Sequence, residues 1–248
     1  LGPVVWTLVT ALTPVDSSGH RTLSLAAFRD VFTKIDVIRL FWNSTIVTGL
    51  CAIGQMFTAA LAGYAFARLR FRGSNLLFGI ILATMMIPSH VTLIPNYKIV
   101  VDMKLINTYA ALFLTNMFTG ANAFNIFFFR QFFLSIPKDL ENAAIIDGCT
   151  RLGVFFRIVL PNAKPAIATT AILSFRSVWN AFLWPMLVIN DYDKLTLTVG
   201  LKYLKEWEPN WAVLLAGASL SIVPIVIVFL IFQKQFMAST MNSGFGGK

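Results

Sequence analysis

The sequence predicts an all-α membrane protein with several spans. Of its 248 residues, 57% are hydrophobic and only 12% are charged, whereas a soluble domain is about one quarter charged. Long apolar runs recur along most of the chain, and the backbone polar groups of such runs are satisfied in lipid by helices. The composition excludes an ordinary cytosolic enzyme and a disordered chain. Two distant cysteines, Cys51 and Cys149, exclude a disulfide framework.

The first two apolar runs predict a partial span and a complete one. Residues 1–13 carry no charge but are too few for the roughly 20 residues of a spanning helix, so we expect the outer half of a first span, truncated in this chain. The polar residues 14–39 are expected outside the cell. The second span, 40–66, closes on a cationic cluster within residues 68–72, which is typical of a cytoplasmic loop.

Four further spans follow. The third, 76–95, contains Pro88 and should be kinked there, and the fourth, 108–129, is interrupted near Gly120. The amphipathic residues 131–165 form the longest predicted cytoplasmic loop. The last two spans are 166–189 and 211–232, and they flank an external loop from Asn190 to Asn210.

The net charge of +9 raises the question of nucleic acid. No soluble segment carries a basic stripe with interleaved aromatic residues, so we interpret the Lys and Arg residues as markers of cytoplasmic span ends. The sequence therefore predicts a lipid bilayer around the chain and no nucleic-acid partner.

Several kinds of chemistry are missing from the sequence. The two histidines, His20 and His90, have no metal-ligand partner nearby, and no GxxxxGK[ST] loop is present. We therefore expect no catalytic site, no metal site and no cofactor in this chain, so that energy from ATP must enter through a partner. The Asp and Glu residues all lie outside the predicted spans, which weakens the alternative of a secondary carrier or channel, although sodium sites built from carbonyls would escape this argument. A membrane enzyme would need a nucleophile and base pair that we do not find.

The segment from Ile136 to Gly148 predicts a short helix in the cytoplasmic loop. It has Pro137 in its first turn, acidic residues near its N-terminus and Gly148 as its stop. Glu141, Ala144 and Gly148 share one face with Ile145, and small residues there allow another surface to approach closely. The alternative is a membrane-surface helix that only connects two spans.

The same segment resembles a known motif. The run from Glu141 to Gly148, followed by Ile158 to Pro161, is similar to the EAA loop of binding-protein-dependent ABC importers, with its pattern EAAxxxG, a gap, and IxLP. Further landmarks resemble the carbohydrate-uptake permeases, above all the smaller permease subunit of maltose-type importers. They cover nearly the whole chain: Asn43-Ser44, residues 63–68, residues 71–73, Ile87-Pro88, residues 95–97, residues 129–133, Trp179-Asn180 and Pro185.

This resemblance implies a type I ABC importer permease fold with six spans in the bacterial cytoplasmic (inner) membrane. It implies three kinds of partner: a second related permease, two cytoplasmic ATPase subunits that hold ATP and Mg, and an extracytoplasmic sugar-binding protein. The chain would transport an oligosaccharide by alternating access. Coupling to the ATPase would fall to Glu141, Asn142, Ala143, Ala144, Asp147 and Gly148, and Asn142 stands where the pattern has its Glu.

Three residues of the fifth span are candidates for the substrate pathway. Arg176 lies near its middle, where a cation costs roughly 2.5–3.5 kcal/mol, and Asn180 follows on nearly the same face, next to Trp179. Arg176 either pairs with a partner's acid or helix carbonyls, or attracts an acidic sugar, and Trp179 is either a sugar contact or packing. The substrate stays open between neutral oligosaccharides, acidic ones and a phosphorylated polyol.

Two more predictions concern the external loop between the last two spans and the polar residues of the second span. By position and by the resemblance, Tyr203 and Trp207 in the external loop are candidates for contact with the binding protein. Asn43 and Gln55 in the second span are expected to form hydrogen bonds between helices rather than to bind a ligand.

Overall fold

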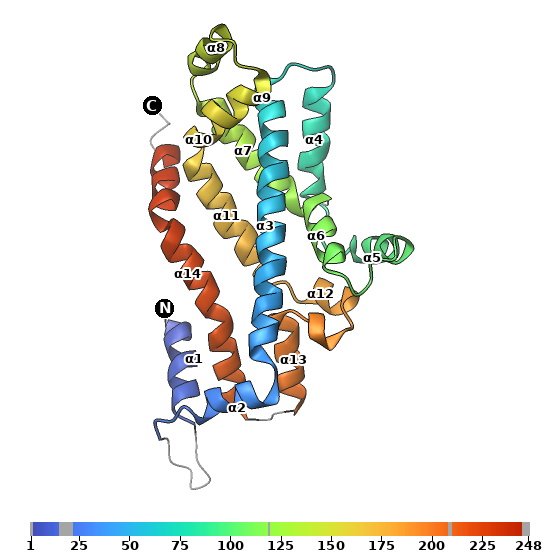
Figure 1. Ribbon diagram of the computed structural model, residues 1–248, viewed down its shortest axis with the longest axis vertical. Helices are drawn as coiled ribbons and strands as arrows, with labels where there is room; N and C mark the ends of the chain where they lie inside the picture. The colour runs from blue at the N-terminus through green and yellow to red at the C-terminus, as the bar shows by residue number, and fades with distance from the viewer. Residues whose placement is uncertain (1, 15–21, 119, 208–209, 245–248) are drawn as a thin grey trace.

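The computed structural model describes residues 2–14, 22–118, 120–207 and 210–244, without the side chains of residues 121, 206–207 and 235–244. Every regular element within these ranges is a helix, which confirms the predicted class. Long helices run along one axis, and short helices cross both ends of the bundle (Figure 1).

The helix α3, Val37–Arg68, forms the centre of the bundle and is the longest of the inner helices. Asp36 caps its N-terminus: the Asp36 carboxylate accepts a hydrogen bond from the amide of Arg39 at 3.1 Å. Polar and small side chains line its buried side. It packs against α6 (Tyr109–Phe118), α7 (Ala123–Ser135), α11 (Lys164–Trp179) and α13 (Leu197–Trp207).

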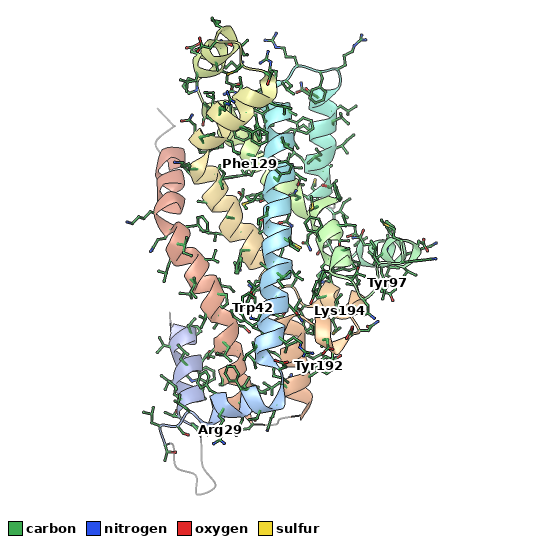
Figure 2. All side chains as sticks on the ribbon, viewed as in Figure 1. Arg29, Trp42, Tyr97, Phe129, Tyr192 and Lys194 are labelled. Carbon is green, nitrogen blue, oxygen red and sulfur yellow. The ribbon has the colours of Figure 1, made fainter. Side chains whose placement is uncertain are left out.

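The other helices surround this centre. The long helix α14, Trp211–Gly244, packs against α11 and carries two N-terminal helices, α1 (Gly2–Leu12) and α2 (Ala26–Lys34). The short helix α4, Ser74–Thr84, packs on α7. The helix α5, Leu93–Asp102, projects sideways from the bundle, and its Tyr97 marks this projection in Figure 2.

Two helices, α3 and α14, are each long and apolar enough to cross a membrane. Two bent pairs pass the same test as combined spans: α6 with α7, bent by 47°, and residues 151–162 with α11, bent by 79°. Neither pair is therefore a single straight helix.

The helix bounds differ from two predicted spans. In the third, the helix stops at Thr84 and resumes only at Leu93 as α5, because Pro88 lacks an amide hydrogen and disfavours a helical residue before it. In the fifth, α11 ends at Trp179 and a separate helix, α12 (Leu183–Val188), follows. Both breaks face the same cavity, described below.

The predicted cytoplasmic loop is helical and lies at one end of the bundle. It contains α8 (Lys138–Ile146), α9 (Arg151–Val154), a π-helical segment η2 (Phe155–Val159) and α10 (Leu160–Asn162). Gly148 has φ of +84° and ends α8, as its position predicted. The connection from α3 to α4, with the cationic residues 68–72, lies at the same end (Figure 1).

A glycine sets the spacing between α3 and α7. A Cβ atom at Gly63 would lie 2.8 Å from Phe129 Cβ, 3.0 Å from the Arg130 amide nitrogen and 3.2 Å from the Ile126 carbonyl oxygen. Because two of these atoms belong to the backbone of α7, they cannot rotate away. Gly49 lies on the same helix, where a Cβ would meet nothing within 4 Å.

We predict that Gly63→Ala forces α3 and α7 apart and destabilises the purified protein by about 1–3 kcal/mol, the usual cost of overpacking. Thermal unfolding in detergent measures this as a lower midpoint. Gly49→Ala is the matched control, with an unchanged or slightly raised midpoint expected because alanine favours a helix. Equal midpoints for the two variants would contradict the close approach.

Candidate functional site

The short helix α8 presents two different faces. Glu141 and Ala144 are buried against the rest of the chain, whereas Asn142, Ala143 and Asp147 are exposed. Ile146 is 85% exposed, more than almost any other apolar side chain in the described part of the protein. An apolar side chain held at the tip of the molecule indicates a surface that another protein can cover.

The structure gives Glu141 a different position from the one expected for an ATPase contact. Its carboxylate lies 2.6 Å from Arg68 Nε, and both side chains are nearly inaccessible, at 5% and 3% exposure. The prediction identified the shared face of Glu141 and Ala144, but this face turns inward, towards the ends of α3 and α7. The exposed members of the predicted coupling set are Asn142, Ala143, Asp147 and Gly148.

A cavity of about 960 Å³ opens on the side of the bundle where α4 and α11 end. Its walls come from α6 and α12, the turn between α4 and α5, and the residues that follow α11. Hydroxyl, amide and imidazole groups supply its polar lining: Thr84, Ser89, His90, Thr92, Asn96, Thr115, Asn116, Ser177 and Thr196. Among its lining residues there is no Lys, Arg, Asp or Glu.

A network of side-chain amides and hydroxyls lies beside this cavity. Gln55 Nε2 donates to the Asn116 carbonyl at 3.1 Å, Asn122 Nδ2 donates to Thr58 Oγ1 at 2.8 Å, and Asn125 Nδ2 donates to Ser174 Oγ at 3.0 Å. These bonds join α3 to α6, α3 to Asn122 just before α7, and α7 to α11. They confirm that Gln55 bonds between helices.

The three predicted pathway residues lie in different surroundings: two are exposed and Trp179 is buried. Arg176 and Asn180 are exposed on α11, and Asn180 Nδ2 donates to the Arg176 carbonyl at 3.0 Å, which caps the helix. Neither residue lines the cavity, whose wall starts at the neighbouring Ser177. The predicted residues lie at the end of α11 that borders the cavity, whereas the hydroxyl residues of the cavity lining carry no distinctive sequence pattern.

Trp179 is a packing residue in this structure, and the prediction of a sugar contact does not fit its position. Its side chain is 2% exposed, its Nε1 donates to the Ser221 carbonyl of α14 at 3.0 Å, and its ring stacks on Phe175 with centroids 5.4 Å apart. Phe41 of α3 meets it edge-on at 5.6 Å. The ring therefore joins α3, α11 and α14.

The loop before α13 lies at the end of the molecule opposite α8. Figure 2 shows Tyr192 and Lys194 beside the first half of α3. Asn43 Nδ2 donates to the carbonyls of Asp193 at 2.8 Å and Leu195 at 3.0 Å, which confirms its predicted role. The Lys194 ammonium and the backbone amide of Asp193 lower the pKa of the Asp191 carboxyl.

Of the two predicted binding-protein contacts, Tyr203 is half-buried on α13. Its ring packs edge-on against Tyr192 at 6.2 Å, at the same end of the bundle. The side chain of Trp207 lies outside the described residues. A contact with a binding protein stays a prediction for both.

Among the described residues, no three His, Cys, Asp or Glu side chains gather in a group that could hold a metal ion. His90 is exposed at the cavity, and His20 lies outside the described residues.

Comparison with known proteins assigns this arrangement to a family. The model of the family described as "Binding-protein-dependent transport system inner membrane component" matches residues 40–240. The arabinooligosaccharides transport system permease protein AraQ of Halalkalibacterium halodurans is 38% identical over 91% of this chain and 81% of its own length. The sn-glycerol-3-phosphate transport system permease protein UgpE of Brucella abortus is 35% identical over 84% of this chain and 74% of its own length.

A solved structure has the same fold. It belongs to a bacterial ABC transporter involved in the import of the acidic polysaccharide alginate, and it superposes with a TM-score of 0.81 over 94% of this chain and 90% of that chain, at 24% sequence identity.

We predict that Trp179→Ala destabilises the purified protein by roughly 3–5 kcal/mol, because it leaves a cavity between three helices and removes the hydrogen bond to the Ser221 carbonyl. Trp42→Ala is the control, since Trp42 lies on α3 and is 61% exposed. The measurement is the thermal unfolding midpoint of each variant in detergent. A Trp179 variant as stable as the Trp42 variant would show that the ring is not part of the core.

Proposed function

Since the chain belongs to the family of binding-protein-dependent transport system inner membrane components, we propose that it forms half of the translocation pathway of an ATP-driven oligosaccharide importer. Two features of one bundle carry this proposal: α8 with its exposed face at one end, and farther along a cavity that has hydroxyl and amide groups among apolar residues and no charged residue in its lining. In this proposal the chain binds and moves its cargo and catalyses no reaction.

The exposed face of α8 is the proposed contact with the cytoplasmic ATPase. Ile146 would enter an apolar recess of that subunit, with Asn142 and Asp147 at its rim, as in helix-in-groove recognition. The Asn142 amide would donate or accept a hydrogen bond where the family pattern offers a carboxylate. Two ATPase subunits would bind ATP and Mg, one of them beneath this chain and the other beneath a second related permease.

The proposed mechanism is alternating access. ATP binding would draw the ATPase pair together and move α8, and the bundle would turn to open the pathway towards the outside. An extracytoplasmic binding protein would then deliver the sugar at the end that holds Tyr192 and Tyr203. The exposed face of α8 and the end with Tyr192 and Tyr203 would both act on one equilibrium between two conformations. Nucleotide binding on the inside and cargo delivery on the outside would therefore be coupled. The proposed location is the bacterial cytoplasmic membrane.

For the cargo, the cavity favours an uncharged oligosaccharide. Its lining offers hydroxyl, amide and imidazole groups that match sugar hydroxyls, and no fixed charge that would pair with a carboxylate or phosphate. The exposed Arg176 supports the alternative of an acidic sugar, because a guanidinium binds carboxylates in a bidentate fork. The relatives are named for both neutral and phosphorylated cargo.

We predict that Ile146→Asp weakens binding of the ATPase subunits by about tenfold or more, since burying an unpaired charge in an apolar recess is costly. The tagged permease is titrated with detergent-solubilised ATPase, and the amount of ATPase that copurifies measures the change in binding. Leu25→Asp is the control: Leu25 is 70% exposed and directly precedes α2, which lies at the end of the molecule opposite α8. Equal ATPase binding by both variants would place the contact elsewhere, and absence of any ATPase with the wild type would favour a secondary carrier or channel.

We predict that the binding protein, loaded with neutral oligosaccharides, stimulates the ATPase activity of the reconstituted complex. Because Arg176 lies outside the cavity lining, Arg176→Gln should keep this stimulation within about twofold of the wild type. Lys98→Gln, on the projecting α5, is the control for removal of a cation. Stimulation by acidic oligosaccharides alone, lost in the Arg176 variant of an intact complex, would instead assign charge recognition to Arg176.

A further inference from the structure

The buried ion pair between Arg68 and Glu141 joins elements that lie far apart in the sequence. We propose that it is the joint through which movement of α8 is passed to α3 and α7, so that Glu141 is a positioning residue inside this chain rather than a contact to the ATPase. The inference rests on the proposed function, and it assigns a role within it to two residues whose side chains never reach the protein surface.

Arg68 is the last residue of α3 and holds three elements at once. Its Nε lies 2.6 Å from Oε1 of Glu141, which belongs to the first turn of α8. Its terminal nitrogen donates to the Phe133 carbonyl at 2.6 Å and also to the Ile136 carbonyl. Phe133 lies in the last turn of α7 and Ile136 directly follows the helix, where the final carbonyls of a helix lack a full set of intrahelical partners. The guanidinium therefore fixes the end of α3, the end of α7 and the start of α8.

Glu141 is held from the other side by an aromatic cluster. The hydroxyl of Tyr64, one turn before Arg68 on α3, lies 3.4 Å from Glu141 Oε2. The Tyr64 ring packs on Phe133 at 6.2 Å and on Phe155 at 5.1 Å. Phe155 begins η2, so the cluster also reaches the segment that leads to α11. The cluster excludes water from the pair and gives the carboxylate one orientation.

The burial of the pair decides what it can do. A surface ion pair would exchange partners with water and transmit little force. This pair is almost inaccessible, so separating it would leave two unpaired charges in an apolar cluster, which is strongly unfavourable. When α8 is displaced, moving α3 and α7 with it therefore costs less than opening the joint.

The remaining contacts of α8 show why such a joint is needed. The helix packs against α9 and η2, which precede α11. It is connected to α7 by Ile136, which has an extended backbone, and Pro137. A two-residue extended link can pivot, so by itself it would let α8 swing without turning α7. Arg68 spans this link by bonding the carbonyls on its α7 side and Glu141 beyond it.

The test uses the complete complex, reconstituted with its binding protein, and compares sugar transport with basal and stimulated ATPase activity. Glu141→Gln keeps the shape of the side chain and removes the charge. Arg68→Lys keeps the charge and removes the fork that bonds the carbonyls. We expect both variants to bind the ATPase subunits and retain basal activity, while stimulation by loaded binding protein and transport fall about tenfold, within the range of about 5- to 150-fold typical of coupling between sites.

Asp139→Asn is the matched control, since Asp139 is an exposed acid in the first turn of the same helix, and we expect it to couple as the wild type does. The reciprocal variant, Arg68→Glu with Glu141→Arg, keeps both charges but loses the bonds to α7, and should stay uncoupled. A purely structural pair would lower assembly and basal activity together and would leave the ratio of stimulated to basal activity unchanged.

The double variant Arg68→Met with Glu141→Leu covers the case in which a single variant fails to assemble, because replacing both charges by apolar groups avoids an unpaired buried charge. If this double variant, or Glu141→Gln, couples transport to ATP hydrolysis as the wild type does, the proposed joint is overturned. Loss of coupling in an assembled double variant would support it. A wild-type complex that no loaded binding protein stimulates would instead contradict the proposed function itself.

Discussion

The polar side chains of α3 must find their partners inside the protein, because the core of a bilayer offers none. Because of this constraint, hydrogen bonds hold neighbouring segments to α3 at three positions along its length. Near the start of α3, Asn43 bonds the loop before α13, and Ser44 accepts a hydrogen bond from the Leu197 amide at 2.7 Å. Gln55 bonds α6 in the middle. At the end, Arg68 bonds α7 and α8. The neighbours of α3 are therefore determined by hydrogen bonds as well as by packing.

The same arrangement divides the molecule into rigid and open parts. The α8 end has a dense aromatic cluster around Phe129, Phe133 and Phe155, and the opposite end has its own core around Trp179. Beside this second core, α4 and α11 both stop at an open cavity that mixes apolar residues with hydroxyl and amide groups. A pathway in such a bundle can change shape at the helix breaks while the two packed ends keep their internal order. That is the mechanical requirement for alternating access.

The sequence was sufficient for the helical class, the short helix with its Gly148 stop, and the hydrogen-bonding roles of Asn43 and Gln55, because these depend on local pattern or on the absence of water. It was insufficient wherever orientation decided the outcome. Periodicity placed Glu141 and Ala144 on one face of α8, but only the fold shows that this face meets Arg68, which lies far away in the sequence. For Trp179, spacing alone gave no way to distinguish an exposed ring from a buried one. The cavity lining escaped notice because scattered Ser, Thr and Asn residues form no motif until four separate segments are brought together.

Because Glu141 points inward, it cannot supply the carboxylate that the family pattern has at position 142. In the family pattern the carboxylate stands immediately before the two alanines, where this chain has the exposed Asn142. Glu141 cannot substitute for it from the next position, because a step of one residue turns a side chain by about 100° around the helix, and Arg68 already binds its carboxylate. The outward surface of α8 therefore relies on the apolar Ile146, with the exposed Asn142 and Asp147 at its rim. An ATPase that fits this chain should accordingly offer an apolar recess with a polar rim, rather than a cation placed opposite residue 142.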